Sequence, residues 1–286
     1  MQTPYCLPTV YLNGAFMPLE DAKISPLDRG FIFGDGVYEV IPYFGGKGLR
    51  AQEHLVRFAR SMALLDIANP HSIEEWTAIV EALVAHNKEP NAAVYMQVTR
   101  GVAKRDFSPS KDTVPTVFLM ANKLTQPPAS LYENGLSCVS GDDARWGHCN
   151  IKATALLGAV MHKHEANQAG ADEIVLFRDG FLTESSASNV AMVKDGVILC
   201  PPMDNLILGG ITYQLMQDLA RMNGMAVEAR KIRRREVFTA DELWMMSSTK
   251  DVIPITKLDG KVVGTGKPGA LFKKMSALFQ DYIAKL

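Results

Sequence analysis

The stretches Cys149-Asn150-Ile151-Lys152 and Thr183-Glu184-Ser185-Ser186-Ala187-Ser188-Asn189-Val190 carry the strongest signal in this chain. In the first stretch, one lysine stands just before the apolar helical pattern of residues 155–161. In the second, one glutamate opens a run of small residues. A lysine amine can form a Schiff base with an aldehyde cofactor, and a glutamate can keep a pyridine nitrogen protonated. Together the two stretches predict pyridoxal phosphate (PLP) chemistry.

Each of the two charged residues also has a simpler interpretation. A lysine is usually a solvated surface charge, and a glutamate beside serines is often a capping or turn residue. The neighbouring Ile151 and the apolar helix favour partial burial of Lys152, which would lower the pKa of its amine and make it nucleophilic. The small residues after Glu184 would let a flat ring approach the backbone.

Length and composition indicate an ordinary globular protein. The 286 residues favour two domains or one large domain, at roughly 150 residues per domain. Hydrophobic residues make up 47% and charged residues 21% of the chain, and the net charge is −1. Because there is no general basic field, we expect no nucleic-acid partner. No apolar run reaches the roughly 18 residues of a membrane span, so we expect no membrane association.

The cysteine pattern favours reduced thiols. The four cysteines are widely spaced and form no Cys-x-x-Cys pair, so a zinc ribbon or redox dithiol is not expected. The segment Met1-Gln2-Thr3-Pro4-Tyr5 has no basic region followed by an apolar core, so we expect no secretory signal and a cytoplasmic protein. His162-Lys163-His164 lacks the H-E-x-x-H spacing, and we expect no metal site. The cysteines are Cys6, Cys138, Cys149 and Cys200.

The first part of the chain mixes strands with helices. Asn13-Gly14 and Gly45-Gly46 predict hairpin turns, the first of type I′. Between them, the glycine-rich stretch 28–36 leads into a strand that begins at Val37. Apolar spacing predicts helices over residues 53–65 and 72–87. Two further strands are expected around residues 92–100 and 115–121.

A proline pair marks the boundary between two predicted domains. Pro127-Pro128 stands in a polar stretch and can continue neither a helix nor a central strand. We therefore predict an N-terminal α/β domain over residues 1–124, a linker over 125–131 and a C-terminal α/β domain over 132–286 that carries the lysine. Strands and helices do not alternate strictly, so the predicted class is α+β. In the second domain we expect strands near 136–140, 173–177, 189–194, 197–200, 226–230 and 252–258, with helices over 154–168 and 211–222 and from about 269 onwards.

Three separate features could bind a phosphate, which needs N–H donors, hydroxyls and a cation. Leu208-Gly209-Gly210-Ile211-Thr212 opens a helix and can offer backbone N–H groups. Ser247 and Ser248 add hydroxyls at the end of an apolar strand, and Arg57 could supply the cation. Each signal is weak alone, because a Gly-Gly-Ile-Thr run is ordinarily a helix start and an arginine is ordinarily a surface charge.

Taken together, these residues resemble the fold type IV PLP enzymes, the family of branched-chain and D-amino-acid aminotransferases and aminodeoxychorismate lyase. The match runs nearly end to end, and it is closest to the D-amino-acid aminotransferases. The motifs that carry it are Asp28-Arg29-Gly30, Gly34-Asp35-Gly36-Val37-Tyr38-Glu39-Val40, Glu53-His54-x-x-Arg57, Thr99-Arg100-Gly101, Arg145-Trp146-x-x-Cys149-x-Ile151-Lys152, Thr183-Glu184 through Asn189-Val190, Gly210-Ile211-Thr212 and Ser247-Ser248-Thr249.

The resemblance implies a role for each site residue. It implies a two-domain fold with PLP between the domains, in a homodimer whose partner loop helps close the site. Lys152 would form the Schiff base and move the substrate proton, and Glu184 would pair with the pyridine nitrogen. Leu208 would pack against the ring. The phosphate ligands would be Arg57, Ile211, Thr212, Ser247 and Ser248, and the substrate pocket would contain Tyr38, Val40, Arg105 and Phe107.

One position departs from the D-amino-acid pattern. These enzymes commonly carry Arg-x-His on the loop after the Thr-Arg-Gly strand, and both residues bind the α-carboxylate. Here Arg105 matches the arginine, but Phe107 stands where histidine is expected. A lone arginine can still bind a carboxylate through two hydrogen bonds. A phenylalanine makes the pocket more apolar, which would also suit an amine that has no carboxylate.

The sequence therefore predicts a PLP-dependent aminotransferase that moves an amino group from a D-amino acid, such as D-alanine, to a 2-oxo acid. The alternatives within the family are an (R)-amine or branched-chain L-amino-acid transaminase and a 4-amino-4-deoxychorismate lyase. An alternative of another class is a catalytically silent dimer that keeps the fold as an interaction module. Intact Lys152, Glu184 and Arg57 argue against the silent protein, because it would not need them.

Overall fold

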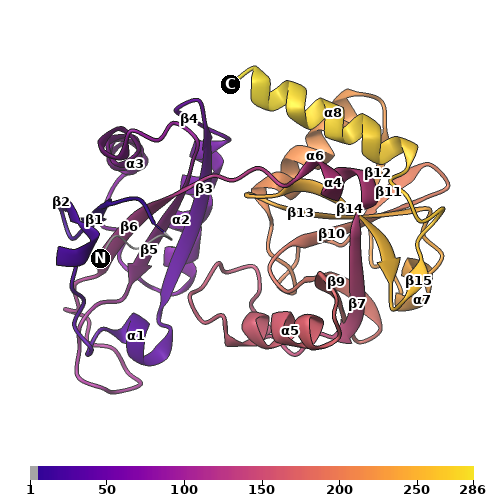
Figure 1. Ribbon diagram of the computed structural model, residues 1–286. Helices are drawn as coiled ribbons and strands as arrows, with labels where there is room; N and C mark the ends of the chain where they lie inside the picture. Colours follow the sequence, from indigo (N-terminus) through magenta and orange to yellow (C-terminus); the bar gives the residue numbers. More distant parts are fainter. Residues whose placement is uncertain (1–5) are drawn as a thin grey trace. The chain divides into compact units, whose positions relative to one another are not determined.

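A computed structural model of the protein describes residues 6–286, so Met1–Tyr5, where the sequence shows no signal features, lies outside the described residues. Contacts divide the chain into two compact units (Figure 1). Unit 1 holds the described residues up to Thr125, together with Ile151–Leu156 and Leu286. Unit 2 holds Gln126–Asn150 and Leu157–Lys285. The domain limits set from the sequence stay a prediction, but the lysine segment has its contacts in unit 1.

Unit 1 is an antiparallel sheet covered by helices. The described part of its six-stranded sheet has the order β2-β1-β6-β5-β3-β4. Its strands are β1 (Thr9–Leu12), β2 (Ala15–Pro18), β3 (Gly36–Phe44), β4 (Lys47–Gly48), β5 (Ala92–Thr99) and β6 (Thr116–Lys123). Its helices are the short 3-10 helix η1 (Leu19–Asp21), α1 (Arg29–Phe33), α2 (Ala51–Leu64) and α3 (Ile73–Asn87).

Apolar side chains of α2 and α3 pack on one face of this sheet and form the core of unit 1. Phe58 of α2 and Trp76 of α3 are fully buried, with ring centroids 5.4 Å apart. Alternate residues of the central strands, such as Ile41 and Met96, complete the same cluster. A capping box between Ser72 and Glu75 begins α3 close to the position expected from the sequence.

Unit 2 is a larger mixed sheet, in which β11–β12, β14–β7 and β7–β8 are parallel pairs. The order is β12-β11-β10-β13-β14-β7-β8-β9, with β15 paired to β14. Its strands are β7 (Leu136–Asp142), β8 (Glu173–Arg178), β9 (Phe181–Ser185), β10 (Asn189–Lys194), β11 (Val197–Cys200), β12 (Ala226–Ala229), β13 (Glu242–Ser247), β14 (Asp251–Leu258) and β15 (Lys261–Val262).

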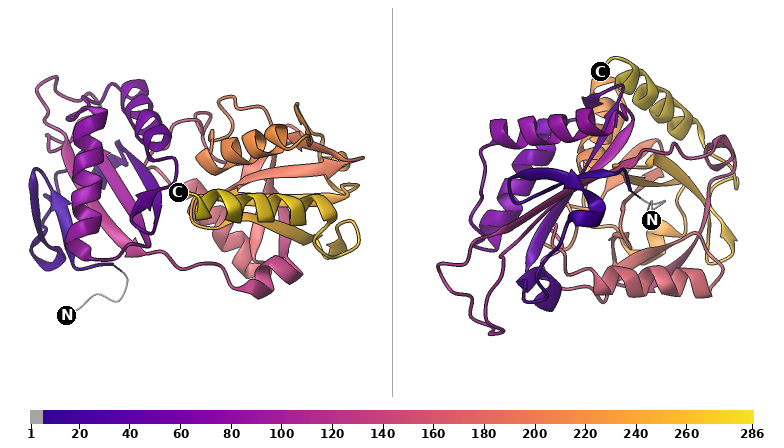
Figure 2. Two further views of the ribbon diagram at one scale, coloured as in Figure 1. Left: turned by 90° about the horizontal axis from the view of Figure 1, so that it is seen from above. Right: turned by 60° about the vertical axis from the view of Figure 1, so that its left-hand side comes forward.

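The helices of unit 2 are α4 (Ala129–Asn134), α5 (Leu157–Gln168), α6 (Ile211–Met222), α7 (Arg234–Val237) and α8 (Ala270–Ala284). Helices α6 and α8 lie beside each other against the sheet, and Figure 2 shows α8 in yellow crossing its strands. Trp244 of β13 and Phe272 of α8 are buried where they meet. Within residues 6–286, no helix has both the length and the apolar character needed to cross a bilayer.

The predicted helix over residues 154–168 was wrong at its start. Residues 151–156 are not helical, and α5 begins only at Leu157. Ala153 pairs with Val37 of β3, and the Thr154 amide donates to the Gly36 carbonyl at 2.9 Å. These backbone groups are therefore taken by the sheet of unit 1, which prevents a helix from starting earlier.

A substitution at Gly101 would show how tightly the loop after β5 is held. Its φ of +102° and a Cβ position only 1.8 Å from the Val114 carbonyl oxygen both require glycine. We expect Gly101→Ala to lower the free energy of unfolding by more than the roughly 1–2 kcal/mol of left-handed strain. Gly46→Ala is the matched control, because Gly46 has a φ of +82° and open space around it. Equal losses in chemical denaturation would show that the carbonyl contact is unimportant.

Candidate active site

The lysine segment is fixed on the first strand residues of β3. The Tyr38 amide donates to the Lys152 carbonyl at 2.9 Å, and the Thr154 hydroxyl donates to the Gly34 carbonyl at 2.9 Å. A Cβ on Gly36 would lie 2.9 Å from the Val98 carbonyl oxygen, so glycine lets this strand lie close to its neighbour. The backbone of Lys152 is thereby held by the sheet rather than by a free loop.

The side chain of Lys152 lies over an aromatic surface of unit 1. Its Nζ is 4.2 Å from the centroid of the Tyr38 ring. Tyr38 stacks on Tyr95 with centroids 5.6 Å apart, and Tyr95 donates to Gln97 Oε1 at 2.6 Å. Val40 lies opposite Tyr95 in the β3–β5 register. The predicted substrate residues Tyr38 and Val40 therefore share one sheet face with each other, and Tyr38 also lies beside the lysine amine.

Glu39 lies between Tyr38 and Val40 in β3 and points to the opposite face of the sheet, beneath α2. Its carboxylate accepts from Arg57 Nε at 2.9 Å and from Arg57 Nη2 at 2.6 Å, and it lies 3.0 Å from His54 Nδ1. All three side chains are buried. Burial raises the pKa of the Glu39 carboxyl, but Arg57 and His54 lower it well below its ordinary value. The predicted phosphate-binding Arg57 is therefore held by a buried ion pair.

Arg105 and Phe107 lie on the exposed loop that follows β5. The Arg105 guanidinium lies 5.6 Å from the centroid of the Phe33 ring and 5.6 Å from that of the Phe107 ring. The buried Arg29 donates to the backbone carbonyls of Asp106 at 2.5 Å and of Phe107 at 3.3 Å. Arg29 thus anchors the loop, and the two aromatic rings restrain Arg105.

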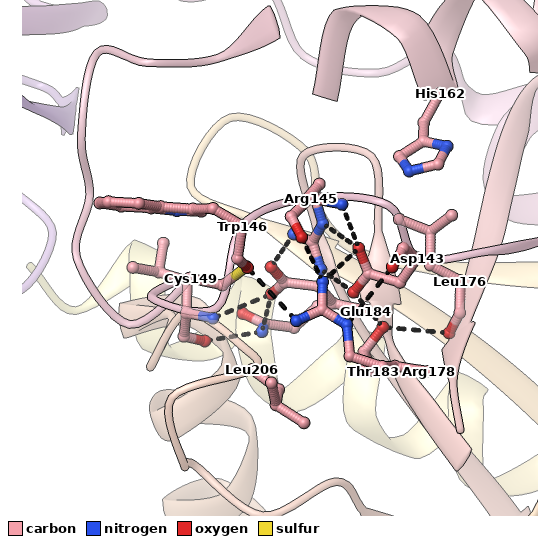
Figure 3. Close-up of polar contacts among 12 residues, drawn as sticks. Asp143, Arg145, Trp146, Cys149, His162, Leu176, Arg178, Thr183, Glu184 and Leu206 are labelled. Atoms are coloured by element: carbon pink, nitrogen blue, oxygen red, sulfur yellow. Dashed lines mark hydrogen bonds and ion pairs between the residues drawn. The ribbon is translucent and has the colours of Figure 1, made fainter. Parts of the chain in front are cut away.

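In unit 2, Glu184 on β9 is buried and surrounded by donors (Figure 3). Its Oε1 accepts from Arg145 Nη1. Its Oε2 accepts from the Leu208 amide at 3.1 Å and from Asn189 Nδ2 at 3.1 Å. The fixed carboxylate is suited to accept a hydrogen bond from a protonated ring nitrogen.

Arg145 is itself held by a second carboxylate. Asp143 accepts from Arg145 Nε at 2.9 Å and from Nη2 at 2.8 Å, and it also accepts from the Thr183 hydroxyl at 2.9 Å. Arg178 Nη2 lies 3.2 Å from Asp143 Oδ1. Burial raises the pKa of the Asp143 carboxyl, but Arg145 overcomes this effect and lowers the pKa to about 2. The network therefore contains two carboxylates and two guanidinium groups (Figure 3).

Asn189 connects Glu184 to the predicted phosphate-binding elements. Its Nδ2 also donates to the Leu208 carbonyl at 2.8 Å, and it pairs with Met246, the residue before Ser247, in the β10–β13 register. A Cβ on Gly210 would lie 2.0 Å from Asn189 Oδ1, so only glycine fits there. Gly210 precedes α6, which begins at Ile211 without a side-chain cap.

Unit 2 therefore brings several predicted residues close to one another along the chain and across the sheet. The N-terminus of α6 offers the Ile211 and Thr212 amides, where the helix dipole favours an anion. Ser247 ends β13 and Ser248 begins the turn that follows it. The structure thus joins Glu184 to Leu208 by hydrogen bonding, and Ser247 follows Met246, the residue that pairs with Asn189 in the sheet.

Comparisons with known proteins identify the family. A family model described as amino-transferase class IV matches residues 36–258. The D-alanine aminotransferase of Bacillus licheniformis is 37% identical over 274 residues, which cover 96% of each chain. The D-alanine aminotransferase of Listeria monocytogenes serotype 4b is 38% identical over 282 residues, again covering 96% of each chain. The chain therefore belongs to the class IV aminotransferases.

Solved structures show the same fold. The branched-chain amino acid aminotransferase of Escherichia coli superposes with a TM-score of 0.92 at 23% identity, covering 96% of this chain and 94% of the other. That of Thermobaculum terrenum, solved in its PLP form, gives a TM-score of 0.88 at 21% identity, covering 99% and 96%. The predicted α+β architecture of fold type IV is confirmed, as is the prediction of a PLP-dependent transaminase.

Each unit has residues with the chemistry that PLP requires. Lys152 carries an amine in unit 1, and the buried Glu184 carboxylate in unit 2 suits a ring nitrogen. The uncapped start of α6 suits a phosphate, and Gly210 stands where any Cβ would collide with Asn189. When bound, PLP supplies an electron sink that stabilises negative charge at the substrate Cα.

Several residues of these networks escaped the sequence-based prediction. Arg145 and Asn189 stand inside quoted motifs, but their spacing does not reveal that both contact Glu184. Glu39 follows Tyr38 in a strand pattern, and only the position of α2 shows that it meets Arg57. The signal available in the sequence was an acid, Glu39, inside an apolar strand pattern and next to the predicted pocket residue Tyr38.

The Glu39–Arg57 pair predicts a large effect of a small substitution. Glu39→Gln leaves a buried guanidinium without its charged partner, so the free energy of unfolding should fall by about 3–5 kcal/mol near neutral pH. The lowered carboxyl pKa adds stability above the unfolded-state pKa of about 4.3, and this stability is lost as the pH falls further. The difference in the free energy of unfolding between Glu39→Gln and wild type should therefore become smaller at acid pH.

The control for Glu39→Gln is Glu53→Gln on α2, where the side chain is 49% exposed and 3.8 Å from Arg50. It should cost less than about 1 kcal/mol. Chemical denaturation of both variants between neutral and acid pH measures the difference. A Glu39→Gln protein as stable as the control would contradict the importance of the buried pair.

Proposed function

We propose that the protein is a D-amino-acid aminotransferase that moves an amino group from D-alanine, or a similar D-amino acid, to a 2-oxo acid such as 2-oxoglutarate or pyruvate. The buried Glu184 carboxylate, held by Arg145, Asn189 and the Leu208 amide, is the observation that supports the chemistry. The substrate class is supported by relatives named D-alanine aminotransferase that match nearly the whole chain.

Each residue has a distinct role in this proposal. Lys152 would hold the cofactor through its amine, and the same amine would act as the base that moves the substrate Cα proton. Its backbone pairing with β3 supports this role, because a base must be held within reach of the proton it transfers. Glu184 would accept a hydrogen bond from the protonated ring nitrogen, and Leu208 would pack against the ring. The proposed phosphate ligands are Arg57, the amides of Ile211 and Thr212, and the hydroxyls of Ser247 and Ser248.

The substrate α-carboxylate is assigned to Arg105. Phe107 provides no hydrogen bond, but its ring and that of Phe33 lie 5.7 Å apart and both contact the Arg105 guanidinium. Cation–π contacts use the face of the guanidinium and leave its N–H groups at the edge able to donate. The stacking therefore supports a carboxylate role for Arg105 with Phe107 in place of histidine.

The working form is proposed to be a homodimer in the cytoplasm. A second copy of the chain could cover Phe31, which is 78% exposed, and Val114, which is 79% exposed. The four cysteines are free thiols, as suits a reducing compartment.

An (R)-amine transaminase is the second candidate, because the exposed Phe107 makes the carboxylate loop more apolar than a histidine would. A branched-chain L-amino-acid transaminase has support only from the fold of the solved structures. A lyase would release pyruvate from its substrate without an amino acceptor, which a transaminase does not do.

The first experiment is the visible spectrum of the protein with PLP, before and after D-alanine, L-leucine or (R)-1-phenylethylamine is added separately. We expect only D-alanine to convert the cofactor to its amino form, since it belongs to the proposed substrate class. The conversion is visible because the amino group stays on the protein until an acceptor arrives. Lys152→Ala should show no such conversion. Conversion by L-leucine alone, or by the amine alone, would overturn the proposed substrate class.

A second experiment tests the carboxylate site. Arg105→Ala should raise KM for D-alanine by at least about tenfold, since a charged hydrogen bond worth roughly 1.5–3 kcal/mol is lost. KM for (R)-1-phenylethylamine should change little, because this amine has no carboxylate. Lys104→Ala, one residue away on the same exposed loop, is the control. Equal effects of Arg105→Ala on both substrates would place the carboxylate elsewhere.

A further inference from the structure

Arg145 helps to hold Glu184, the residue that would meet the cofactor ring, but no effect of its positive charge on the chemistry follows from that contact alone. It lies after β7 in the motif Arg145-Trp146-x-x-Cys149, which the similarity to D-amino-acid aminotransferases drew attention to. Its Nη1 donates to Glu184 Oε1, and the side chain is only 9% exposed. An arginine with so little exposed surface therefore contacts Glu184 directly.

The orientation of Arg145 is determined by its other partners. Asp143 binds the Nε and Nη2 edge of the guanidinium at 2.9 and 2.8 Å, and this leaves Nη1 directed to Glu184 (Figure 3). The Thr183 hydroxyl and Arg178 hold Asp143 in turn. A Cβ on Gly158 would approach Arg145 Cγ to 3.3 Å, so the helix α5 also limits where the side chain can lie.

The charges in the network are divided unequally between the two acids. Asp143 contacts both Arg145 and Arg178, whereas the ion pairs among the described residues give Glu184 the cation Arg145 alone. The other two donors to Glu184, Asn189 and the Leu208 amide, are neutral. Burial raises the pKa of the Glu184 carboxyl, and Arg145 is the main group that opposes this rise.

We propose that Arg145 is a positioning residue that keeps Glu184 ionised and aims its carboxylate at the ring nitrogen of the cofactor. This inference rests on the proposed function. It means that the Arg145–Glu184 ion pair sets the charge of Glu184 as well as its position. A neutral Glu184 could not balance the charge of a protonated ring nitrogen, so the electron sink would weaken. Arg145 therefore controls the cofactor through Glu184, without touching the substrate.

Other titratable groups face the Arg145–Glu184 pair, and their effects must be distinguished from the effect of Glu184. Burial raises the pKa of the Cys149 thiol to about 11, and burial also raises the pKa of the Tyr213 hydroxyl above its ordinary value. Against the effect of burial, Arg145 lowers the pKa of the Asp143 carboxyl to about 2, and Arg178 Nη2 lies 3.2 Å from Asp143 Oδ1. His162 of α5 accepts from the Ala144 amide at 3.2 Å, so a His162→Gln variant is a further control.

The test compares Arg145→Gln, Glu184→Gln and the double variant in two measurements. The first is the melting temperature of the PLP-free protein from about pH 5.5 to 8.5. In Arg145→Gln, Glu184 loses its cation and its folded-state pKa rises further. A carboxyl with a raised pKa stabilises the fold at low pH and loses this effect as the pH rises. The melting temperature should therefore fall, relative to wild type, as the pH is raised, and the double variant should not show this dependence.

The second measurement is the dissociation constant of PLP. Arg145→Gln and Glu184→Gln should each raise it by about tenfold or more, and the double variant should be no weaker than the worse single variant. Arg145→Lys, which keeps the charge, should restore the wild-type pH dependence, and it also serves if Arg145→Gln does not fold. Arg178→Gln is the matched control, because Arg178 pairs with Asp143 and not with Glu184 among the ion pairs of the described residues.

Additive effects on PLP binding, or an equal loss of melting temperature at every pH, would overturn the role of Arg145 and leave a purely structural arginine. Wild-type protein that binds no PLP, or that transaminates no amino donor, would instead overturn the proposed function. The two failures are therefore distinguishable.

Discussion

The pairing of Ile151–Leu156 with β3 is the constraint on which the candidate site depends. The segment interrupts the sequence of unit 2, yet its contacts belong to unit 1. Backbone hydrogen bonds to Gly36 and Tyr38 leave Lys152 little freedom of position. A reactive amine on a flexible loop would lose entropy each time it reached the substrate, whereas this lysine has lost that entropy during folding. The glycines at 34 and 36 allow the close approach.

In each unit, an ion pair with little exposed surface fixes the orientation of an arginine side chain. Glu39 restrains Arg57 beneath the sheet of unit 1, and Asp143 restrains Arg145 beside Glu184 in unit 2. Buried pairs of this kind add little net stability, because desolvation offsets the attraction between the charges. Their value is geometric, since a guanidinium held by two hydrogen bonds can direct its remaining donors. In both units, a carboxylate without a proposed contact to the ligand orients a residue that is proposed to act near it.

Much of the fold could be predicted from the sequence because local signals agreed with the tertiary structure. Helix α3 has a capping box, and the first hairpin has Asn13 and Gly14 with positive φ angles. The start of α5 was missed because Thr154 and its neighbours pair with a strand more than a hundred residues earlier. Likewise Lys152 and Glu184 could be singled out by their surroundings in sequence, but Arg145 could not, since its partners depend on how β7, β8 and β9 align.

Where the resemblance predicts a histidine, this chain has Phe107, whose contacts differ in kind. A histidine could bind a carboxylate directly, whereas the rings of Phe107 and Phe33 each lie 5.6 Å from the Arg105 guanidinium. Contact with two rings would lower the entropy that Arg105 loses when it binds a ligand, without using its N–H groups. Arg29 adds to this effect by anchoring the backbone of the loop. If Arg105 binds the substrate carboxylate as proposed, its preorganisation would offset the hydrogen bond that Phe107 lacks.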